Sequence, residues 1–218
     1  MKLTELLKAD LHMHTKYSMD CDTPLEEIIS RCQQTGINCI AIADHGTIEG
    51  ALKLQSMAPF LVIVAEEILT PDGEIMAMFL KDGIPSGLSV PETISRIKNQ
   101  GALVCIPHPF DVFRPSALSI KVVEEILGQI DVMEVFNSRN LFQSSVRAQI
   151  FARQHSIPGS AGSDAHTPSE IGRAYVEMPV FNDRDDFLNA LTKAKLCGRK
   201  TNPLVHFGSI LVRLKNRL

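Results

Sequence analysis

Short apolar runs alternate with amphipathic segments along the whole chain. Runs such as 37–43, 61–65 and 102–106 are apolar at nearly every position, which is typical of parallel strands covered on both faces. The segments between them carry helix signals: Thr23 as N-cap, Pro24 and Glu26 in the first turn, and Gly36 as a stop begin and end one of them. No linker or low-complexity segment interrupts this alternation, so we expect one βα-barrel-like domain, with an open doubly wound sheet as the alternative.

The expected elements are about seven strands and the helices between them. After an opening strand around residues 10–14, we expect strands at 37–43, 61–65, 102–106, 132–136, 159–161 and 175–178, and residues 74–80 are able to pair as a short strand beyond the turn at Asp72-Gly73. Helices are expected at 24–35, 47–57, 91–100, 119–127, 141–155 and 183–196. An amphipathic tail follows. The part from about residue 199 to 218 is predicted to be helical and basic, because seven Lys or Arg and no acid occur between Asn189 and Leu218. A solvated helix face and a surface that binds phosphate or nucleic acid both explain this charge.

Metal-ligand residue types recur where the predicted strands end. In an extended strand His12 and His14 face one way and Leu11 and Met13 the other. Alone, His-x-His is equally typical of two half-exposed histidines. However, further residues of the same types lie in the first loop or at the ends of other strands. They are Asp20, His45, Glu67, His108, Asp164 and His166. In a barrel, strand ends form one mouth where active sites are built, which favours the barrel over the open sheet.

Composition limits the class of protein. The formal net charge is −3, and no apolar run approaches the ~20 residues that a membrane-spanning helix needs. The first residues lack the apolar region of a signal peptide, and the five cysteines are scattered without a C-x-x-C motif. We therefore expect a soluble, cytoplasmic protein with unpaired thiols and no membrane partner. Cys21 adjoins Asp20 and is the cysteine expected nearest a metal.

The ligand set indicates the kind of metal. Imidazoles mixed with carboxylates suit Zn, Mn or Fe better than Ca or a thiolate-held structural zinc. Eight or nine ligands exceed the needs of one ion, so two or three ions with a bridging carboxylate are expected. His155 and His206 fit no such pattern and are expected to have surface or packing roles.

The motifs in order resemble those of the PHP family, the polymerase and histidinol phosphatase domains. The motifs are Asp10-Leu11-His12-Met13-His14, Ala43-Asp44-His45-Gly46, Glu67, Pro107-His108-Pro109, Glu134-Val135-Phe136-Asn137-Ser138 and Gly162-Ser163-Asp164-Ala165-His166. The chain is most similar to the stand-alone metal-dependent phosphoesterases of the family. This resemblance implies a distorted (β/α)7 TIM-like barrel, one domain over residues 1–218, and a trinuclear metal site.

The resemblance also implies which residues hold each ion. It assigns His12, His14, Glu67 and Asp164 to one ion, Glu67 and His108 to a second, and Asp20, His45 and His166 to a third. Two acids, Glu66 and Glu67, compete for the bridging position, and the alignment favours Glu67. Where relatives often carry a further histidine, this chain has Met76. The second ion is then held by fewer ligands, with Glu134 as a candidate substitute, or is absent.

The implied chemistry is hydrolysis of a phosphate ester by a metal-bound hydroxide, without a separate catalytic base. Asp44 is a candidate for orienting an imidazole or, equally, for capping the next helix. Arg139, Arg173 and Lys16 are candidates for binding substrate phosphate, with a solvated surface charge as the alternative for each. The expected substrate is a small phosphorylated metabolite or a nucleotide. A 3′-exonuclease or oligonucleotide phosphodiesterase, and a non-catalytic metal-binding PHP domain, are the alternatives.

Overall fold

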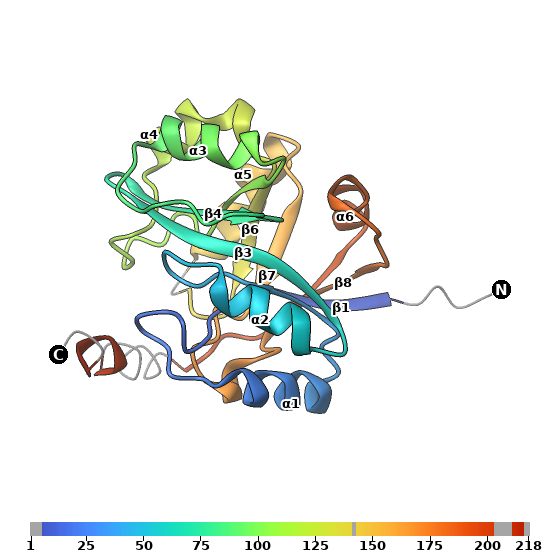
Figure 1. The fold of residues 1–218 in the computed structure, drawn as a ribbon. Helices are drawn as coiled ribbons and strands as arrows, with labels where there is room; N and C mark the ends of the chain where they lie inside the picture. The colour runs from blue at the N-terminus through green and yellow to red at the C-terminus, as the bar shows by residue number, and fades with distance from the viewer. Residues whose placement is uncertain (1–5, 141–142, 203–210, 216–218) are drawn as a thin grey trace.

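The computed structural model describes residues 6–140, 143–202 and 211–215, and in these residues nine strands form one mixed sheet that curls into a nearly closed barrel (Figure 1). The strands are β1 (Leu6–Met13), β2 (Cys39–Ile42), β3 (Leu61–Thr70), β4 (Gly73–Met78), β5 (Leu103–Ile106), β6 (Val132–Asn137), β7 (Gly159–Gly162), β8 (Ala174–Pro179) and β9 (Lys195–Gly198). The helices are α1 (Leu25–Thr35), α2 (Glu49–Met57), α3 (Val90–Asn99), α4 (Ile120–Glu125), α5 (Ser144–Gln154) and α6 (Arg184–Leu191), with short 3-10 turns at Leu127–Gln129 and Pro168–Glu170.

Seven strands, β1 to β7, follow one another around the barrel in chain order. All neighbours among them are parallel except β4, which runs antiparallel to both β3 and β5. The barrel closes where β7 meets β1: Asp164 N donates to His12 O at 2.7 Å, and His14 N donates to Ala165 O at 3.0 Å. β8 and β9 extend the sheet beyond β1 as antiparallel strands. The predicted TIM-like barrel is confirmed, with one strand reversed.

An extra residue in β1 turns both histidines of the opening motif into the barrel. From Asp10 to Met13 the strand advances three residues while its partner β2 advances two, which is a β-bulge. Leu11 packs in the inner core with other strand residues, whereas Met13 packs in the outer core against helices. The prediction that Leu11 and Met13 share a face is therefore wrong. His12 and His14 both reach the interior because the bulge breaks the strict alternation of side chains.

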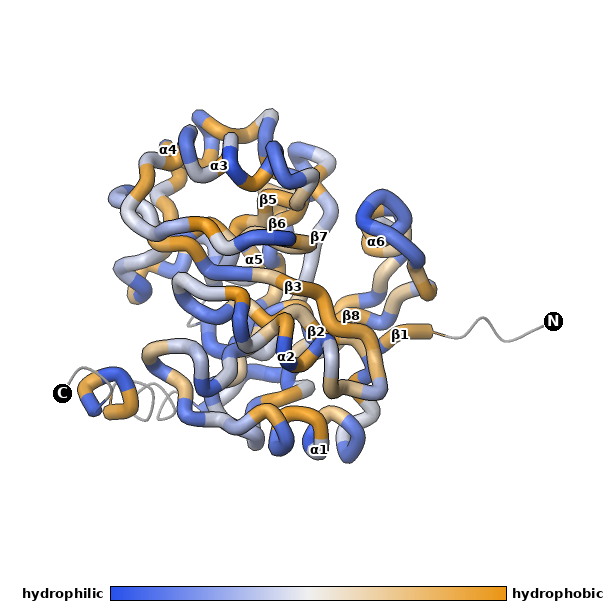
Figure 2. The backbone as a smooth tube through the Cα atoms, in the orientation of Figure 1, coloured by the Kyte–Doolittle hydropathy of each residue, from blue (hydrophilic) through white to orange (hydrophobic). Residues whose placement is uncertain are grey.

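The hydrophobic core has an inner and an outer layer. The outer layer lies between the strands and helices α1 to α5. Figure 1 shows α1 and α2 on one side of the barrel and α3, α4 and α5 on the other. The inner layer fills the barrel itself and includes Met76, Met78 and Phe187 of α6. Figure 2 shows hydrophobic residues along β1, β2 and β3, as expected of strands buried on both faces. The apolar runs of the sequence thus mark strands that are covered inside and outside.

Two local predictions are wrong for identifiable reasons. The helix expected at 183–196 ends at Leu191, because residues 195–198 pair with β8 as strand β9 instead. Thr23 does not cap α1: its hydroxyl donates to the carbonyl oxygen of His166 at 2.9 Å, and Pro24 occupies the cap position. In both cases a contact distant in sequence overrides a local signal. Gly36 does end α1, with a φ of 75° that glycine adopts readily.

The C-terminal segment is described only in part. Residues 203–210 and 216–218, including His206, lie outside the described residues, and residues 211–215 are helical. Lys200 donates to the carbonyl oxygens of Asn140 at 2.8 Å and Asn137 at 3.4 Å, and Lys215 pairs with Asp22 at 3.0 Å. These two cations of the basic segment therefore have separate partners on the barrel.

The cysteines and the helices agree with two further expectations. All five cysteines are free thiols, as predicted, and all but Cys197 are buried. In the part of the chain that the structure describes, no helix combines the length and apolar character needed to cross a membrane.

Candidate metal centre

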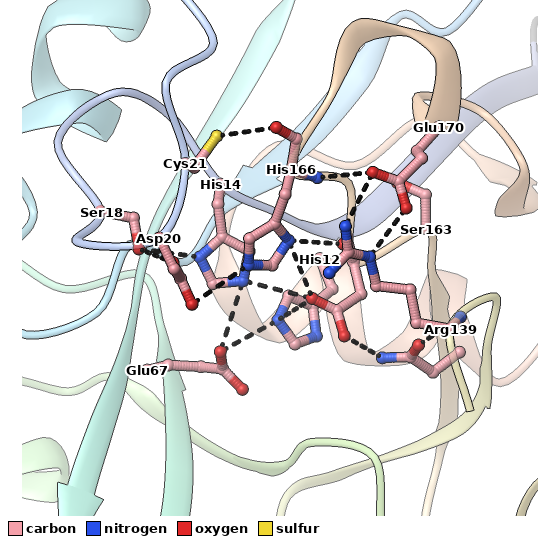
Figure 3. A network of polar contacts seen from close by, with 12 residues as sticks. His12, His14, Ser18, Asp20, Cys21, Glu67, Arg139, Ser163, His166 and Glu170 are labelled. Carbon is pink, nitrogen blue, oxygen red and sulfur yellow. Dashed lines mark hydrogen bonds and ion pairs between the residues drawn. The ribbon is translucent and has the colours of Figure 1, made fainter. Parts of the chain in front are cut away.

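Histidine and carboxylate side chains gather at the mouth of the barrel, where the parallel strands end (Figure 3). The ligand-type atoms form three overlapping groups, and within each group all lie within 4.8 Å of one another. The groups are His14, Asp20, His45 and His166; His12, His14 and Asp164; and His45, Glu67 and Glu74. Residues far apart in sequence thus meet in one place, as the strand-end positions predict.

The first group is centred on the carboxylate of Asp20. Its Oδ2 lies 3.3 Å from His45 Nε2 and 3.4 Å from His166 Nε2. The ring of His14 packs between the other two, with its centroid 4.9 Å from that of His45 and 4.2 Å from that of His166. The loop after β1 therefore returns Asp20 to the histidines, as its spacing from His14 suggested.

The second group is built on the two histidines of β1. Asp164 Oδ1 lies 3.4 Å from His14 Nε2 and 3.8 Å from His12 Nε2. Glu67 Oε2 approaches the same two nitrogens, at 3.4 Å and 3.3 Å respectively. The neighbouring Glu66 faces away from the centre, and its Oε2 accepts a hydrogen bond from Ile84 N at 2.9 Å. Of the two adjacent acids, the structure thus brings only Glu67 to the cluster.

The third group contains Glu74, which is not among the predicted ligands. Its Oε2 lies 3.5 Å from His108 Nε2, and its Oε1 lies 3.6 Å from His45 Nδ1. His108 Nε2 also lies 2.8 Å from Glu67 Oε1. Glu74 stands at the start of β4, and because β4 is antiparallel its start lies at the mouth. One signal in the sequence could have indicated Glu74. It lies two residues before Met76, so both side chains point to the same face of the strand.

The residues present fit divalent metal ions. Among the described residues, five buried ligand atoms in the cluster lack a hydrogen-bond partner: His12 Nε2, His14 Nε2, Glu67 Oε2, Glu74 Oε2 and Asp164 Oδ1. An unsatisfied buried polar atom costs about 1–3 kcal/mol, so five in one place indicate a missing partner. Two ligands bound about 2.1 Å from one ion lie roughly 3.0–3.4 Å apart, close to the separations across these groups. The clustered side chains and this spacing suggest that divalent metal binds here.

Burial and neighbouring charges shift the pKa values of Glu67, Asp164 and His14. Burial raises the pKa values of the Glu67 and Asp164 carboxyls, but nearby cations, His12 for Glu67 and Arg114 for Asp164, lower both well below their usual range. Burial, followed by the charge of His166, lowers the pKa of His14 to about 3. The acids are thus ionised and His14 is neutral, which are the forms that coordinate a metal.

Glu134 supports the cluster from behind, which does not fit its predicted role as a substitute ligand. Its Oε1 lies 3.1 Å from His12 Nδ1, and its Oε2 accepts from His108 N at 2.6 Å and from Asn137 Nδ2 at 2.9 Å. A carboxylate on the far nitrogen of a histidine fixes the ring and its tautomer. Glu134 therefore positions His12 and the backbone of His108.

Asp44 acts on the backbone instead of on an imidazole or a helix end. Its Oδ1 accepts from Thr15 N at 2.6 Å and its Oδ2 accepts from the Thr15 hydroxyl at 2.7 Å. Neither of the two predicted roles is observed among the described residues, because both carboxylate oxygens accept from Thr15 instead. Gly50 is required beside this pair, since a Cβ there would come within 2.2 Å of Asp44 Oδ2. Asp44 thus fixes the chain directly after His14.

Arg139 is also committed within the protein. It is buried, and its Nε and Nη2 donate to the two oxygens of Glu170 at 2.7 Å and 2.8 Å. Glu170 in turn accepts from His166 N at 3.2 Å (Figure 3). This pair holds the loop that carries His166, so the predicted phosphate contact of Arg139 does not fit. Arg173 donates to Ser169 O at 3.2 Å and Lys16 is exposed, and their proposed phosphate contacts stay predictions.

A different arginine reaches the cluster. Arg114, in the loop after β5, donates from Nη2 to Asp164 Oδ2 at 2.6 Å. Burial lowers the pKa of the guanidinium, but the charge of Asp164, followed by those of Glu67 and Glu74, raises it above its ordinary value. The Arg114 side chain keeps 20% of its surface exposed, so it can meet a ligand. Sequence reasoning missed it because a loop of irregular structure gives no spacing signal.

The thiol of Cys21 belongs to none of the three ligand groups. Its Sγ donates to the carbonyl oxygen of His166 at 3.2 Å. Burial raises the pKa of this thiol to about 12, which favours its protonated form. His155, at the end of α5, lies outside the cluster with its ring 4.4 Å from that of Phe151.

An α/β barrel with histidines and carboxylates clustered at its mouth is typical of metal-dependent hydrolases. Two sequence families match: the PHP domain over residues 10–67 and a PHP-associated region over residues 146–196. The uncharacterized protein MJ0417 of Methanocaldococcus jannaschii is 34% identical over 212 residues, which span 95% of this chain and 86% of the relative. The chain belongs to the PHP family.

Solved structures share the fold at low sequence identity. One is a two-domain protein of Bacteroides vulgatus that contains a predicted PHP-like metal-dependent phosphoesterase, with a TM-score of 0.74 and 18% identity. The match covers 89% of this chain and 65% of that one. Another is the lesion-specific endonuclease EndoQ of Pyrococcus furiosus, with a TM-score of 0.66 and 16% identity, covering 91% of this chain and 60% of that one. These neighbours and the family suggest hydrolase activity.

Proposed function

We propose that this protein hydrolyses phosphate monoesters of small molecules with two or three divalent ions, Zn, Mn or Fe, at the barrel mouth. The observation that carries the proposal is the set of buried, unpartnered ligand atoms on His12, His14, Glu67, Glu74 and Asp164. Divalent ions bound there supply a water activated near neutral pH and offset negative charge on the phosphoryl group. We propose Asp20, His45, His108 and His166 as the remaining ligands.

Residues of the chain itself have defined roles in this proposal. Glu67 faces His12 and His14 with one oxygen and His108 with the other, which suits a bridging carboxylate. Arg114 places a permanent positive charge beside Asp164, where it can bind the phosphoryl oxygens of a substrate. Glu134 keeps His12 in one orientation. No side chain other than these ligands is required to act as a base.

The test is metal-dependent release of phosphate from p-nitrophenyl phosphate and from a panel of nucleotides and sugar phosphates. We expect activity with Mn or Zn that is lost on chelation and falls at least ~10³-fold in His12→Ala, since a ligand change removes several kcal/mol of transition-state stabilisation. His155→Ala is the matched control, because His155 lies outside the cluster. Full activity in the metal-stripped protein or in His12→Ala would refute the proposal.

An oligonucleotide phosphodiesterase is the second candidate, and the endonuclease among the structural neighbours favours testing it. Phosphate backbones bind with an affinity that falls steeply as salt rises. Cleavage of a short oligonucleotide, together with salt-sensitive binding, would support the phosphodiesterase over the monoesterase. A chain that carries stoichiometric metal but releases product from neither substrate class would instead support a non-catalytic domain.

A further inference from the structure

Asn137 is the last residue of β6, and its side chain is fully buried beside the candidate metal centre. Glu134 lies three residues earlier, so in a regular strand the two side chains would face opposite sides. β6 instead advances two residues, from Glu134 to Phe136, while its partner β7 advances one, which is a β-bulge. The bulge brings the amide of Asn137 to within 2.9 Å of Glu134 Oε2. As in β1, an extra residue turns two polar side chains to the same side.

The amide of Asn137 joins two carboxylates. Its Nδ2 donates to Glu134 Oε2 at 2.9 Å and to Asp164 Oδ2 at 3.2 Å, and an NH2 group has one hydrogen for each. Its Oδ1 accepts from Arg139 N at 2.9 Å. This network fixes the orientation of the amide, because after a flip its oxygen would face two carboxylate oxygens and its NH2 group a backbone N–H. The side chain is thus a bridge of defined geometry.

One end of the bridge determines which oxygen of Asp164 remains for a metal. Arg114 Nη2 also donates to Asp164 Oδ2, at 2.6 Å, so this oxygen accepts from two donors. The other oxygen, Oδ1, has no hydrogen-bond partner among the described residues and lies 3.4 Å from His14 Nε2. Asp164 is therefore held by one oxygen and presents the other to the cluster.

The other end of the bridge reaches the support of two histidines. Glu134 Oε1 lies 3.1 Å from His12 Nδ1, and its Oε2 accepts from His108 N at 2.6 Å. We propose that Asn137 is a positioning residue, which fixes Asp164 and Glu134 relative to each other and thereby strengthens metal binding. This inference rests on the metal ligands of the proposed function and is independent of the proposed hydrolysis.

The first experiment measures the affinity of the protein for Zn²⁺ by competition with a chromogenic chelator, without any substrate. Asn137→Leu keeps roughly the volume of the side chain and removes both donors. We expect the affinity to fall roughly 10- to 100-fold, the loss typical of partners behind metal ligands. Asn140→Leu is the matched control, because Asn140 is also buried and its amide has no hydrogen-bond partner in the described part of the chain. Equal affinity in the wild type and both variants would overturn the inference.

Two further measurements separate positioning from a purely structural role. The visible absorption of bound Co²⁺ depends on the number and arrangement of its ligands, so we expect it to change in Asn137→Leu and to stay constant in Asn140→Leu. Asn137→Leu combined with Glu134→Gln should weaken Zn²⁺ binding by less than the product of the two single losses, because both residues belong to one network. An unchanged spectrum, or a loss equal to that product, would overturn the inference.

A second variant covers the case in which Asn137→Leu does not fold. Asn137→Ser has one hydroxyl donor for two carboxylates, so we expect it to lose at least about fivefold in affinity. Unchanged affinity in folded Asn137→Ser would overturn the inference.

The outcomes also separate this inference from the proposed hydrolysis. Affinity lost in Asn137→Leu, in a protein that binds Zn²⁺ but releases phosphate from none of the esters, would support the positioning role and refute the hydrolysis. Unchanged affinity in a protein that does release phosphate would overturn the positioning role and leave the hydrolysis intact. A wild-type protein that binds no Zn²⁺ would overturn both.

Discussion

The two ends of the barrel interior are filled by opposite kinds of side chain. β4 shows the change within one strand, since Glu74 at the mouth faces the histidine cluster while Met76 and Met78 lie in the apolar inner core. At the far end the rings of Phe79 and Phe187 pack edge to face, with centroids 5.1 Å apart. The comparison indicates a division of roles between the two ends. The apolar end stabilises the fold, and the polar end carries unsatisfied polar groups that a rigid fold must hold in place.

Removing a ring from the apolar end tests this division with the largest expected effect. Phe187 is fully buried in α6, so Phe187→Ala should lower the free energy of unfolding by about 3–5 kcal/mol. Metal content and activity per folded molecule should remain near wild type, because this ring packs in the apolar inner core beside Phe79 and Phe181. Denaturant titration and elemental analysis measure the two quantities. Ile120→Ala, at an exposed position, is the control, and loss of metal in folded Phe187→Ala would contradict the division.

Changing one acid at the polar end should lower metal content and activity more than stability. Glu74→Gln removes the charge of a proposed ligand, so we expect the metal content to fall by one ion and kcat to fall roughly 10²-fold, about 2.7 kcal/mol. Stability of the metal-free protein should fall by less than in Phe187→Ala, since the variant loses attraction to His45 and Arg114 but no apolar packing. The control is Glu66→Gln, a buried acid that faces away from the cluster. An unchanged metal content in Glu74→Gln would exclude Glu74 as a ligand.

A third variant acts on the support behind the ligands. Glu134→Gln cannot accept all the bonds that Glu134 now accepts from His12, His108 and Asn137. Outer partners of metal ligands typically contribute 10- to 100-fold to metal affinity, so a loss of roughly that size is expected. Competition with a chromogenic chelator measures it. If the affinity is unchanged, Glu134 has no positioning role.

The smallest expected effect is a pH dependence of metal binding. Burial alone would lower the pKa of His45, but the hydrogen bond that it donates to Asp20 and the charges of Glu67, Asp20 and Glu74 raise it to about 9 in the metal-free protein. His45 is therefore protonated at pH 7 and must lose its proton to bind a metal. Below pH 9 each unit of acidity should weaken affinity up to about tenfold for this proton. Calorimetry in buffers of different ionisation enthalpy measures the proton released, and its absence would contradict this account.

The sequence predicted the barrel and most of the cluster because the relevant signals are local. An apolar run shows where a strand ends, and ligand residues placed at that point must share the mouth of a barrel. Glu74 escaped this rule because β4 is reversed and presents its start to the mouth. The ligand set as a whole remains a prediction until metal is measured.

Other features depend on contacts that no local pattern encodes. Asp44 reaches Thr15 across 29 residues and Glu134 reaches His12 across 122. Arg139 looked available for substrate because nothing near it in sequence indicates its pair with Glu170. β9 replaced the end of a predicted helix for the same kind of reason, since pairing with β8 outweighs helix propensity.

The contact between β1 and β7, where the barrel closes, also constrains when the metal site can assemble during synthesis. Ser163 N donates to Asp10 Oδ1 across 153 residues of chain, and the last proposed ligand, His166, lies just beyond. Contacts of such separation form late in folding. During synthesis His12 and His14 must therefore wait until almost the whole barrel has emerged before their partners exist. A nascent or truncated chain that ends before β7 would expose half a metal site, and premature metal capture becomes a hazard of biosynthesis.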